Sequence, residues 1–123
     1  MIPHSRTRPV AIVDDDPAVL DSLKFLLEVR GYCVATYASA AEFLRSRATD
    51  AVCLILDQHM PRMTGLELAA RLRAASPTLP VLLVTGSPSP DIAKRAAQLG
   101  IKKVLEKPLN EDDLLCFIDA HQH

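Results

Sequence analysis

The sequence is poor in several features that would mark a specialised protein. Its 123 residues include no tryptophan, four glycines and three cysteines, and the net charge is −1 with both signs interspersed. A hydrophobic fraction of 49% without low-complexity segments excludes a disordered or fibrous chain. Without a basic stripe, direct binding to nucleic acid has little electrostatic support.

The cysteines and the short apolar runs bear on the compartment. Cys33, Cys53 and Cys116 are odd in number and lack metal-binding spacing, so we expect small buried hydrophobes in a reducing environment. The longest apolar run, residues 51–56, is far shorter than the roughly 20 residues that span a bilayer. The first residues lack the apolar centre of a signal peptide. These absences predict a cytoplasmic protein that does not engage a membrane.

What the sequence does contain is a regular alternation of two patterns. Short apolar runs rich in Val, Ile and Leu alternate with segments of helical periodicity. The runs cover residues 10–13, 32–37, 51–56, 81–84 and 104–105. Five strand–helix repeats predict an α/β fold with a parallel sheet and helices on both faces. We expect residues 1–123 to form a single domain with a core at about 9–119.

Cap residues mark the helix ends. Asp16 before Pro17 is typical of an N-cap followed by the first helical residue. Segments 39–42 ("SAAE") and 64–67 ("TGLE") match the capping box. Further starts are predicted at Ser89 and Asn110, and helix ends at Gly31 and Gly100.

Polar residues follow four of the predicted strands. They are Asp14, Asp57, Thr85 and Lys107. Because the carboxyl ends of parallel strands share one edge, these side chains should meet in one crevice. Clustered carboxylates there, with Asp15 beside Asp14, would repel one another unless a cation lies between them. All-oxygen ligands favour Mg²⁺, so the sequence predicts a metal site rather than a phosphate loop.

These residues and their surroundings resemble one family, the receiver domains of two-component response regulators. The resemblance covers residues 10–118 and rests on "VDDD", "LDQHMPRMTGLEL", "VTG" and "EKP". Together the four motifs are far more specific than any one alone. The resemblance implies a doubly wound, flavodoxin-like domain with five parallel strands in the order 2-1-3-4-5. It also implies a role in bacterial signal transduction.

The resemblance implies a metal site and a set of ligands. Asp14 and Asp15 match the acidic pair that binds Mg²⁺ (or Mn²⁺), with Asp15 the more direct ligand. Asp57 and the backbone carbonyl of His59 would complete the protein ligands. Asp16 is left out, because its place before Pro17 is explained by helix capping.

The resemblance also implies phosphoryl chemistry. Asp57 matches the aspartate that accepts a phosphoryl group from a phosphohistidine, and Thr85 matches the hydroxyl that binds a phosphoryl oxygen. Lys107 matches the lysine of the site, and the peptide bond to Pro108 is often cis in this family. The ammonium and the metal would offset repulsion between two anions. His59 and Ser87 occupy positions that tune aspartyl-phosphate lifetime in relatives, so changing His59 should affect dephosphorylation more than phosphorylation.

The implied partners are a histidine kinase or a phosphotransfer protein, and an output domain or partner protein downstream. "YASAAEFL" and "MPRMTGLEL" resemble receivers that precede helix-turn-helix domains of transcription regulators. We expect no enzymatic turnover beyond self-phosphorylation and slow autodephosphorylation, and a monomer or a weak, phosphorylation-linked dimer.

Three other functions share parts of this sequence pattern. A non-cycling interaction module stays open, because Val104 stands where many receivers carry a switching aromatic ring. A Mg²⁺-dependent aspartyl-phosphate phosphatase requires a second acid two residues after Asp57. That residue is His59, which argues against this function. A flavin carrier is excluded, because an acidic first loop would repel the flavin phosphate.

Overall fold

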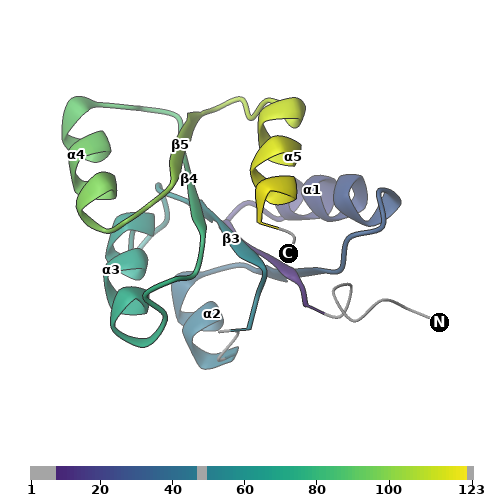
Figure 1. The fold of residues 1–123 in the computed structure, drawn as a ribbon, viewed down its shortest axis with the longest axis horizontal. Coiled ribbons are helices and arrows are strands. Elements are labelled where there is room, and N and C mark those ends of the chain that lie inside the picture. The colour runs from purple at the N-terminus through teal and green to yellow at the C-terminus, as the bar shows by residue number, and fades with distance from the viewer. Residues whose placement is uncertain (1–7, 47–49, 122–123) are drawn as a thin grey trace.

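The computed structural model describes residues 8–46 and 50–121, which form a five-stranded parallel sheet between two layers of helices (Figure 1). Strand β1 (Val10–Val13) leads to α1 (Pro17–Val29), β2 (Val34–Tyr37) to α2 (Ala40–Ser46), and β3 (Cys53–Asp57) to α3 (Gly65–Ala75). Strand β4 (Val81–Thr85) leads to α4 (Pro90–Gln98), and β5 (Lys103–Glu106) to α5 (Glu111–Ala120). The strand order β2-β1-β3-β4-β5 confirms the predicted topology.

The position of a strand in the sheet determines its burial. Every residue of β1, β3 and β4 is buried, whereas the outer strands β2 and β5 are partly exposed. This burial explains why apolar runs predicted the inner strands well. Strand β2 begins at Val34 rather than at residue 32, because the amide of Tyr32 still donates to the carbonyl of Leu27 in the turn that ends α1.

Two apolar clusters fix the helices on opposite faces of the sheet. Helices α1 and α5 lie on one face, and α2, α3 and α4 on the other (Figure 1). Alternate residues of the inner strands serve the two clusters: Ile12 and Ile55 pack toward α1 and α5, whereas Val13 and Leu56 pack toward the other three helices. The period of two in an extended strand produces this division.

Most predicted helix caps are present. Asp16 accepts from the amide of Ala18, and Thr64 and Glu67 form a complete capping box. Ser89 and Asn110 also cap their helices, and Gly31 and Gly100 have positive φ angles of 92° and 68° at the helix ends. In segment 39–42 the Ser39 hydroxyl accepts from the amide of Glu42, but the Glu42 carboxylate accepts from the amide of Ala38 instead of closing the box on Ser39.

Arg73 joins helix α3 to the edge of the sheet where the strands begin, which we call the amino edge. Its guanidinium donates to four backbone carbonyls, at distances between 2.6 and 3.3 Å. These carbonyls belong to Ser76, Leu79, Leu99 and Gly100. Desolvation by burial lowers the pKa of Arg73. The side chain thus ties together the segments that lead into β4 and β5.

The prediction of three buried cysteines is wrong for two of them. Cys53 lies in β3 and is buried, which raises the pKa of its thiol to about 12. Cys33 and Cys116 are exposed, because one precedes an edge strand and the other lies on the outer side of α5.

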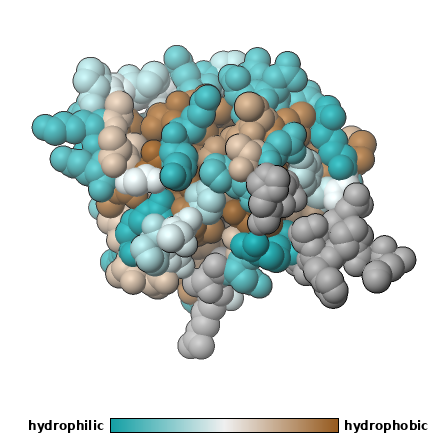
Figure 2. Space-filling model, viewed as in Figure 1, coloured by the Kyte–Doolittle hydropathy of each residue, from teal (hydrophilic) through white to brown (hydrophobic). Residues whose placement is uncertain are grey.

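The surface is mixed in polarity. Figure 2 shows hydrophilic residues over much of the visible face, with apolar residues between them. Two large apolar side chains of α1, Phe25 and Val29, are 71% and 69% exposed. Within residues 8–46 and 50–121, none of the helices combines the length and the apolar character that crossing a bilayer requires.

Candidate phosphoryl and metal site

Four polar residues meet at the edge where the strands end, which we call the carboxyl edge. Asp14 directly follows β1, Asp57 and Thr85 are the last residues of β3 and β4, and Lys107 directly follows β5. Asp14, Asp57 and Thr85 are only 5%, 3% and 0% exposed. The parallel sheet therefore brings together residues up to 93 positions apart in sequence, as the strand ends predicted.

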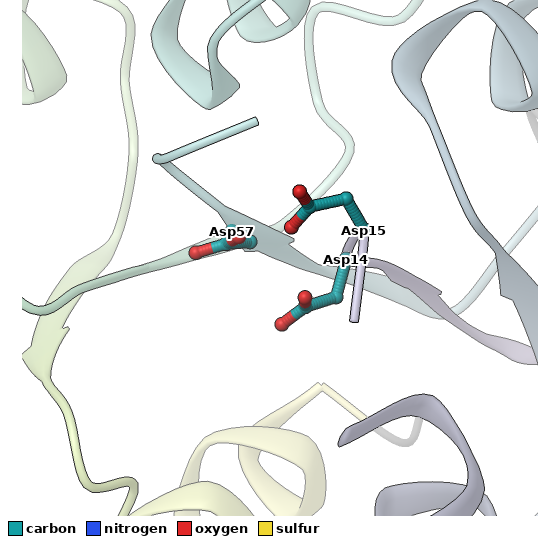
Figure 3. Close-up of side chains that lie close together, drawn as sticks. All are labelled: Asp14, Asp15 and Asp57. Atoms are coloured by element: carbon teal, nitrogen blue, oxygen red, sulfur yellow. The ribbon is translucent and has the colours of Figure 1, made fainter. Parts of the chain in front are cut away.

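Three carboxylates form the acidic part of this site. Oxygens of Asp14, Asp15 and Asp57 lie within 4.8 Å of one another, and Figure 3 shows the three side chains directed into a common space. Asp15 is exposed on the rim. Asp14 Oδ1 accepts from the amide of Asp16 at 2.9 Å, which orients the carboxylate as the chain enters α1.

Lys107 supplies the positive charge. Its Nζ lies 2.9 Å from Asp57 Oδ1 and 3.9 Å from Asp14 Oδ2. Burial acts to lower the pKa of Lys107, but the close contact with the charged Asp57 carboxylate and the charge of Asp14 outweigh it, so the pKa is raised. Burial raises the pKa of Asp14, and the nearby charge of Asp57 adds to this effect. One ammonium therefore faces three acids.

The site leaves oxygen atoms for a further cation. Asp57 Oδ1 is buried, and despite the nearby ammonium the described residues offer it no hydrogen bond with good angular geometry. A largely apolar cavity of about 230 Å³, lined by side chains such as Val19, Leu23 and Leu109, borders these charged groups on the side facing α1 and the β5–α5 loop, so the ligands of a cation come from the carboxylates and not from this cavity. Buried carboxylate oxygens without full compensation are what a hard divalent cation such as Mg²⁺ binds well. The residues present fit the predicted ion.

Thr85 completes the set of predicted side chains. Its hydroxyl lies 2.8 Å from Nε2 of His59 and accepts from the amide of Ser87 at 3.1 Å. Its carbonyl accepts from the amide of Lys107 at 2.9 Å, and the Lys107–Pro108 peptide bond is cis, as predicted. The sequence did not predict the contact with His59, because nothing in a linear pattern shows that the loop after β3 returns to the end of β4.

Two further residues hold the end of β3 in place. The buried side-chain oxygen of Gln58 accepts from the amide of Leu66 at 2.8 Å, and the backbone amide of Gln58 donates to the carbonyl of Val84. Gly65 lies so close to the strand that a Cβ atom would stand 2.5 Å from the carbonyl oxygen of Asp57. Sequence reasoning missed both residues. The glycine in the "MTGLEL" segment was the one available signal, and Gln58 had none.

Val104 lies on β5 with its side chain half-buried, packed against the cluster that faces α2, α3 and α4. It has no ring that could turn between an inward and an outward position. The structure thus locates the departure from the receiver pattern that the sequence indicated.

Residues 10–119 match the family described as response regulator receiver domain, and the chain belongs to this family. The FixJ transcriptional regulatory protein of Azorhizobium caulinodans is 38% identical over 113 residues, which cover 91% of this chain and 54% of FixJ. The response regulator TodT of Pseudomonas putida is 34% identical over 94% of this chain and 51% of its own length. The chain thus spans about half the length of these curated relatives.

Solved structures agree with these matches. A receiver domain protein from Clostridium thermocellum superposes with a TM-score of 0.86 at 29% identity, covering 94% of each chain. The structure of FixJ-N superposes with a TM-score of 0.82 at 30% identity, covering 94% of this chain and 93% of the other. Receiver domains are signalling modules of two-component systems.

Proposed function

We propose that this chain receives a phosphoryl group on Asp57 from a phosphohistidine, in a Mg²⁺-dependent reaction, and changes conformation as a result. One observation carries the proposal. The buried Asp57 carboxylate lies 2.9 Å from the Lys107 ammonium and within 4.8 Å of two more carboxylates. A lone strand-end aspartate would need no such surroundings.

The chemistry follows from this arrangement. A carboxylate oxygen of Asp57 forms a bond to phosphorus while the bond between phosphorus and the donor imidazole breaks, and the bonding pair leaves with the imidazole nitrogen. Asp14, Asp15, Asp57 and the carbonyl of His59 would hold Mg²⁺ or Mn²⁺, which offsets negative charge on the phosphoryl oxygens. Lys107 contributes a second positive charge at the acceptor oxygen.

Thr85 supplies the conformational response. Thr85 is the last residue of a fully buried strand, and its hydroxyl can donate a hydrogen bond to a phosphoryl oxygen. The phosphoryl dianion would therefore favour the conformation in which Thr85 at the end of β4 contacts it over the conformation in which Thr85 does not. Such a difference in free energy between two conformations is what a switch requires. Water would later hydrolyse the acyl phosphate slowly, so the chain would turn over no substrate beyond its own phosphorylation and dephosphorylation.

The partners follow from this function. Phosphohistidine implies a histidine kinase or a phosphotransfer protein as donor. Because the chain spans about half of FixJ and TodT, we propose that the phosphorylated form controls an output domain or a partner protein in the cytoplasm. It would act as a monomer or as a weak dimer linked to phosphorylation.

A receiver that no longer cycles is the alternative with a specific observation behind it, namely Val104 at the place of the switching ring. The complete set of acids, hydroxyl and ammonium at the carboxyl edge favours cycling. A phosphatase that acts on external substrates is less well supported, since His59 occupies the place of a second acid.

The test uses acetyl phosphate with Mg²⁺ and measures the mass of the intact protein. We expect one added phosphoryl group in the wild type, none in Asp57→Asn, and none when the divalent ion is removed with EDTA. Asp16→Asn is the matched control, because this exposed acid caps α1 and asparagine caps equally well. A phosphoryl group that persists in Asp57→Asn would place the acceptor elsewhere.

A further inference from the structure

The hydroxyl of Thr85 already has partners in the structure. It belongs to a side chain that is 0% exposed, so its hydrogen bonds must come from neighbouring protein groups. The Ser87 amide donates to it at 3.1 Å, and Nε2 of His59 lies 2.8 Å away. His59 itself is exposed on the loop between β3 and α3.

The hydrogen-bonding capacity of a hydroxyl determines how these contacts work. Threonine has one O–H proton to donate and two lone pairs to accept with. The Ser87 amide can only donate, so it fills one lone pair. Among the described residues, His59 Nε2 is the hydrogen-bond partner of this hydroxyl that can take its proton. The geometry is therefore satisfied when Nε2 of a neutral imidazole accepts from Thr85 and Nδ1 carries the ring proton.

This bond uses the one proton that a phosphoryl oxygen would need. A hydroxyl cannot donate the same proton fully to two acceptors, so His59 and a phosphoryl group on Asp57 compete for Thr85. Asp57 and His59 are two residues apart, and Gly65 lies against the Asp57 carbonyl, so the competition takes place over a short, tightly packed stretch.

We propose that His59 is a positioning residue that holds the Thr85 hydroxyl until phosphorylation, and that the phosphoryl group on Asp57 replaces it. The exchange releases the His59 imidazole, so the exposed β3–α3 loop changes when Asp57 is phosphorylated. This route does not need an aromatic ring at position 104, where the chain has Val104. This inference rests on the proposed function for its second half. For its first half, the contacts give the pairing of Thr85 with His59, and the direction of donation follows from the hydrogen-bonding capacity of the hydroxyl.

The exchange has a measurable consequence for affinity. An intramolecular hydrogen bond of this kind has a net value that corresponds to a factor of about two to ten. Removing the competitor with His59→Ala should therefore tighten the binding of beryllofluoride, a phosphoryl mimic, by about two- to tenfold. His59→Gln retains an acceptor on a chain of similar reach and should restore most of the wild-type affinity.

A double-mutant cycle separates this effect from a general disturbance of the loop. Thr85→Val removes the hydroxyl at nearly constant volume, so His59→Ala should not change the affinity in that background. An equal gain in both backgrounds, or no gain with Thr85 present, overturns the proposal. Thr85→Ser retains the hydroxyl and should behave like the wild type in the cycle.

Imidazole nitrogen NMR of the full chain gives a second, direct measurement. We expect Nε2 of His59 to show the shift of an unprotonated, hydrogen-bonded nitrogen, and Nδ1 that of a protonated one. The resonances are assigned by their loss in His59→Ala. They should move when beryllofluoride and Mg²⁺ are added, and Thr85→Val should produce the moved position without the mimic. A proton on Nε2 in the free wild type overturns the proposal even if no variant folds.

Fluorine NMR of bound beryllofluoride distinguishes the two failures. A bound signal with unmoved His59 nitrogens overturns the exchange and leaves the proposed function intact. The absence of a bound signal in the presence of Mg²⁺ overturns the proposed function and the exchange with it.

Discussion

At the amino edge of the sheet Arg73 donates to four backbone carbonyls, whereas at the carboxyl edge one ammonium faces three carboxylates. Both arrangements place charge at an edge of the same sheet. The first is nearly saturated with hydrogen bonds, and the second leaves the buried Asp57 Oδ1 without an aligned one. One edge therefore holds the fold together, whereas the other keeps buried polar atoms with which a ligand can pair.

The largest change in stability should come from removing the guanidinium of Arg73. Arg73→Met takes the donor away from four carbonyls, and we expect the free energy of unfolding to fall by about 2–4 kcal/mol. Chemical denaturation measures the loss. Arg71→Met, an exposed arginine of the same helix, is the control and should change stability by at most about 0.5 kcal/mol.

Beryllofluoride binding by folded Arg73→Met should equal that of the wild type, because Arg73 lies at the opposite edge from the acids. A strong loss of binding in the folded variant would contradict the division of roles between the two edges.

The next effect tests how tightly the carboxyl edge is packed. In Gly65→Ala the new Cβ would meet the Asp57 carbonyl oxygen at 2.5 Å and a methyl carbon of Leu83 at 2.9 Å. Helix α3 must therefore shift, and we expect a loss of about 1–3 kcal/mol in unfolding free energy together with slower phosphorylation. Gly86→Ala is the matched control, because its Cβ would have nothing within 4 Å. Equal effects of the two substitutions would show that α3 is not held by close packing.

The smallest change should be an increase in stability, in contrast to the two losses above. Asp14→Asn keeps the oxygen that accepts from Asp16 but removes a buried like charge, so without divalent ions it should stabilise the chain by about 0.5–1 kcal/mol. Asp15→Asn should do less, because Asp15 is exposed. Destabilisation by Asp14→Asn in the presence of EDTA would mean that the cluster is not strained by its charge.

The pH dependence of the same variant follows from the raised pKa of Asp14, which burial causes. Between the usual value of 3.8 and the raised value, the folded chain binds more protons than the unfolded chain. Wild-type stability relative to Asp14→Asn should therefore fall as the pH rises through this window. Added Mg²⁺ should reverse the order by stabilising the wild type, by about 2.7 kcal/mol at 100 times its Kd.

Much of the fold was predictable from the sequence because the inner strands are buried on both faces. Such strands are continuous apolar runs, and the polar residue that ends each run marks the carboxyl edge. The outer strands were placed less well, since partial exposure weakens the pattern in β2 and β5. Two exposed cysteines were predicted to be buried, because residue type alone does not show which side of a helix or which edge a thiol occupies.

The residues of the candidate site were predictable, but their connections were not. Asp14, Asp57, Thr85 and Lys107 stand at strand ends that any parallel sheet brings together. The contacts of His59, Gln58 and Arg73 depend on how loops return to the sheet, and most of their partners are backbone groups. Unlike the amides of a helix cap, which lie two or three residues from the capping side chain, most of these partners come from distant segments of the chain, so no local pattern indicated the bonds.

The bond from the Lys107 amide to the Thr85 carbonyl has a mechanical consequence. This hydrogen bond connects the backbone of Lys107, which carries the ammonium, to the backbone of Thr85, which carries the hydroxyl, at the point where both strands end. If the end of β4 is drawn toward a bound phosphoryl group, the lysine backbone must be drawn along with it. The Lys107 ammonium and the Thr85 hydroxyl would then approach the phosphoryl group together and not independently.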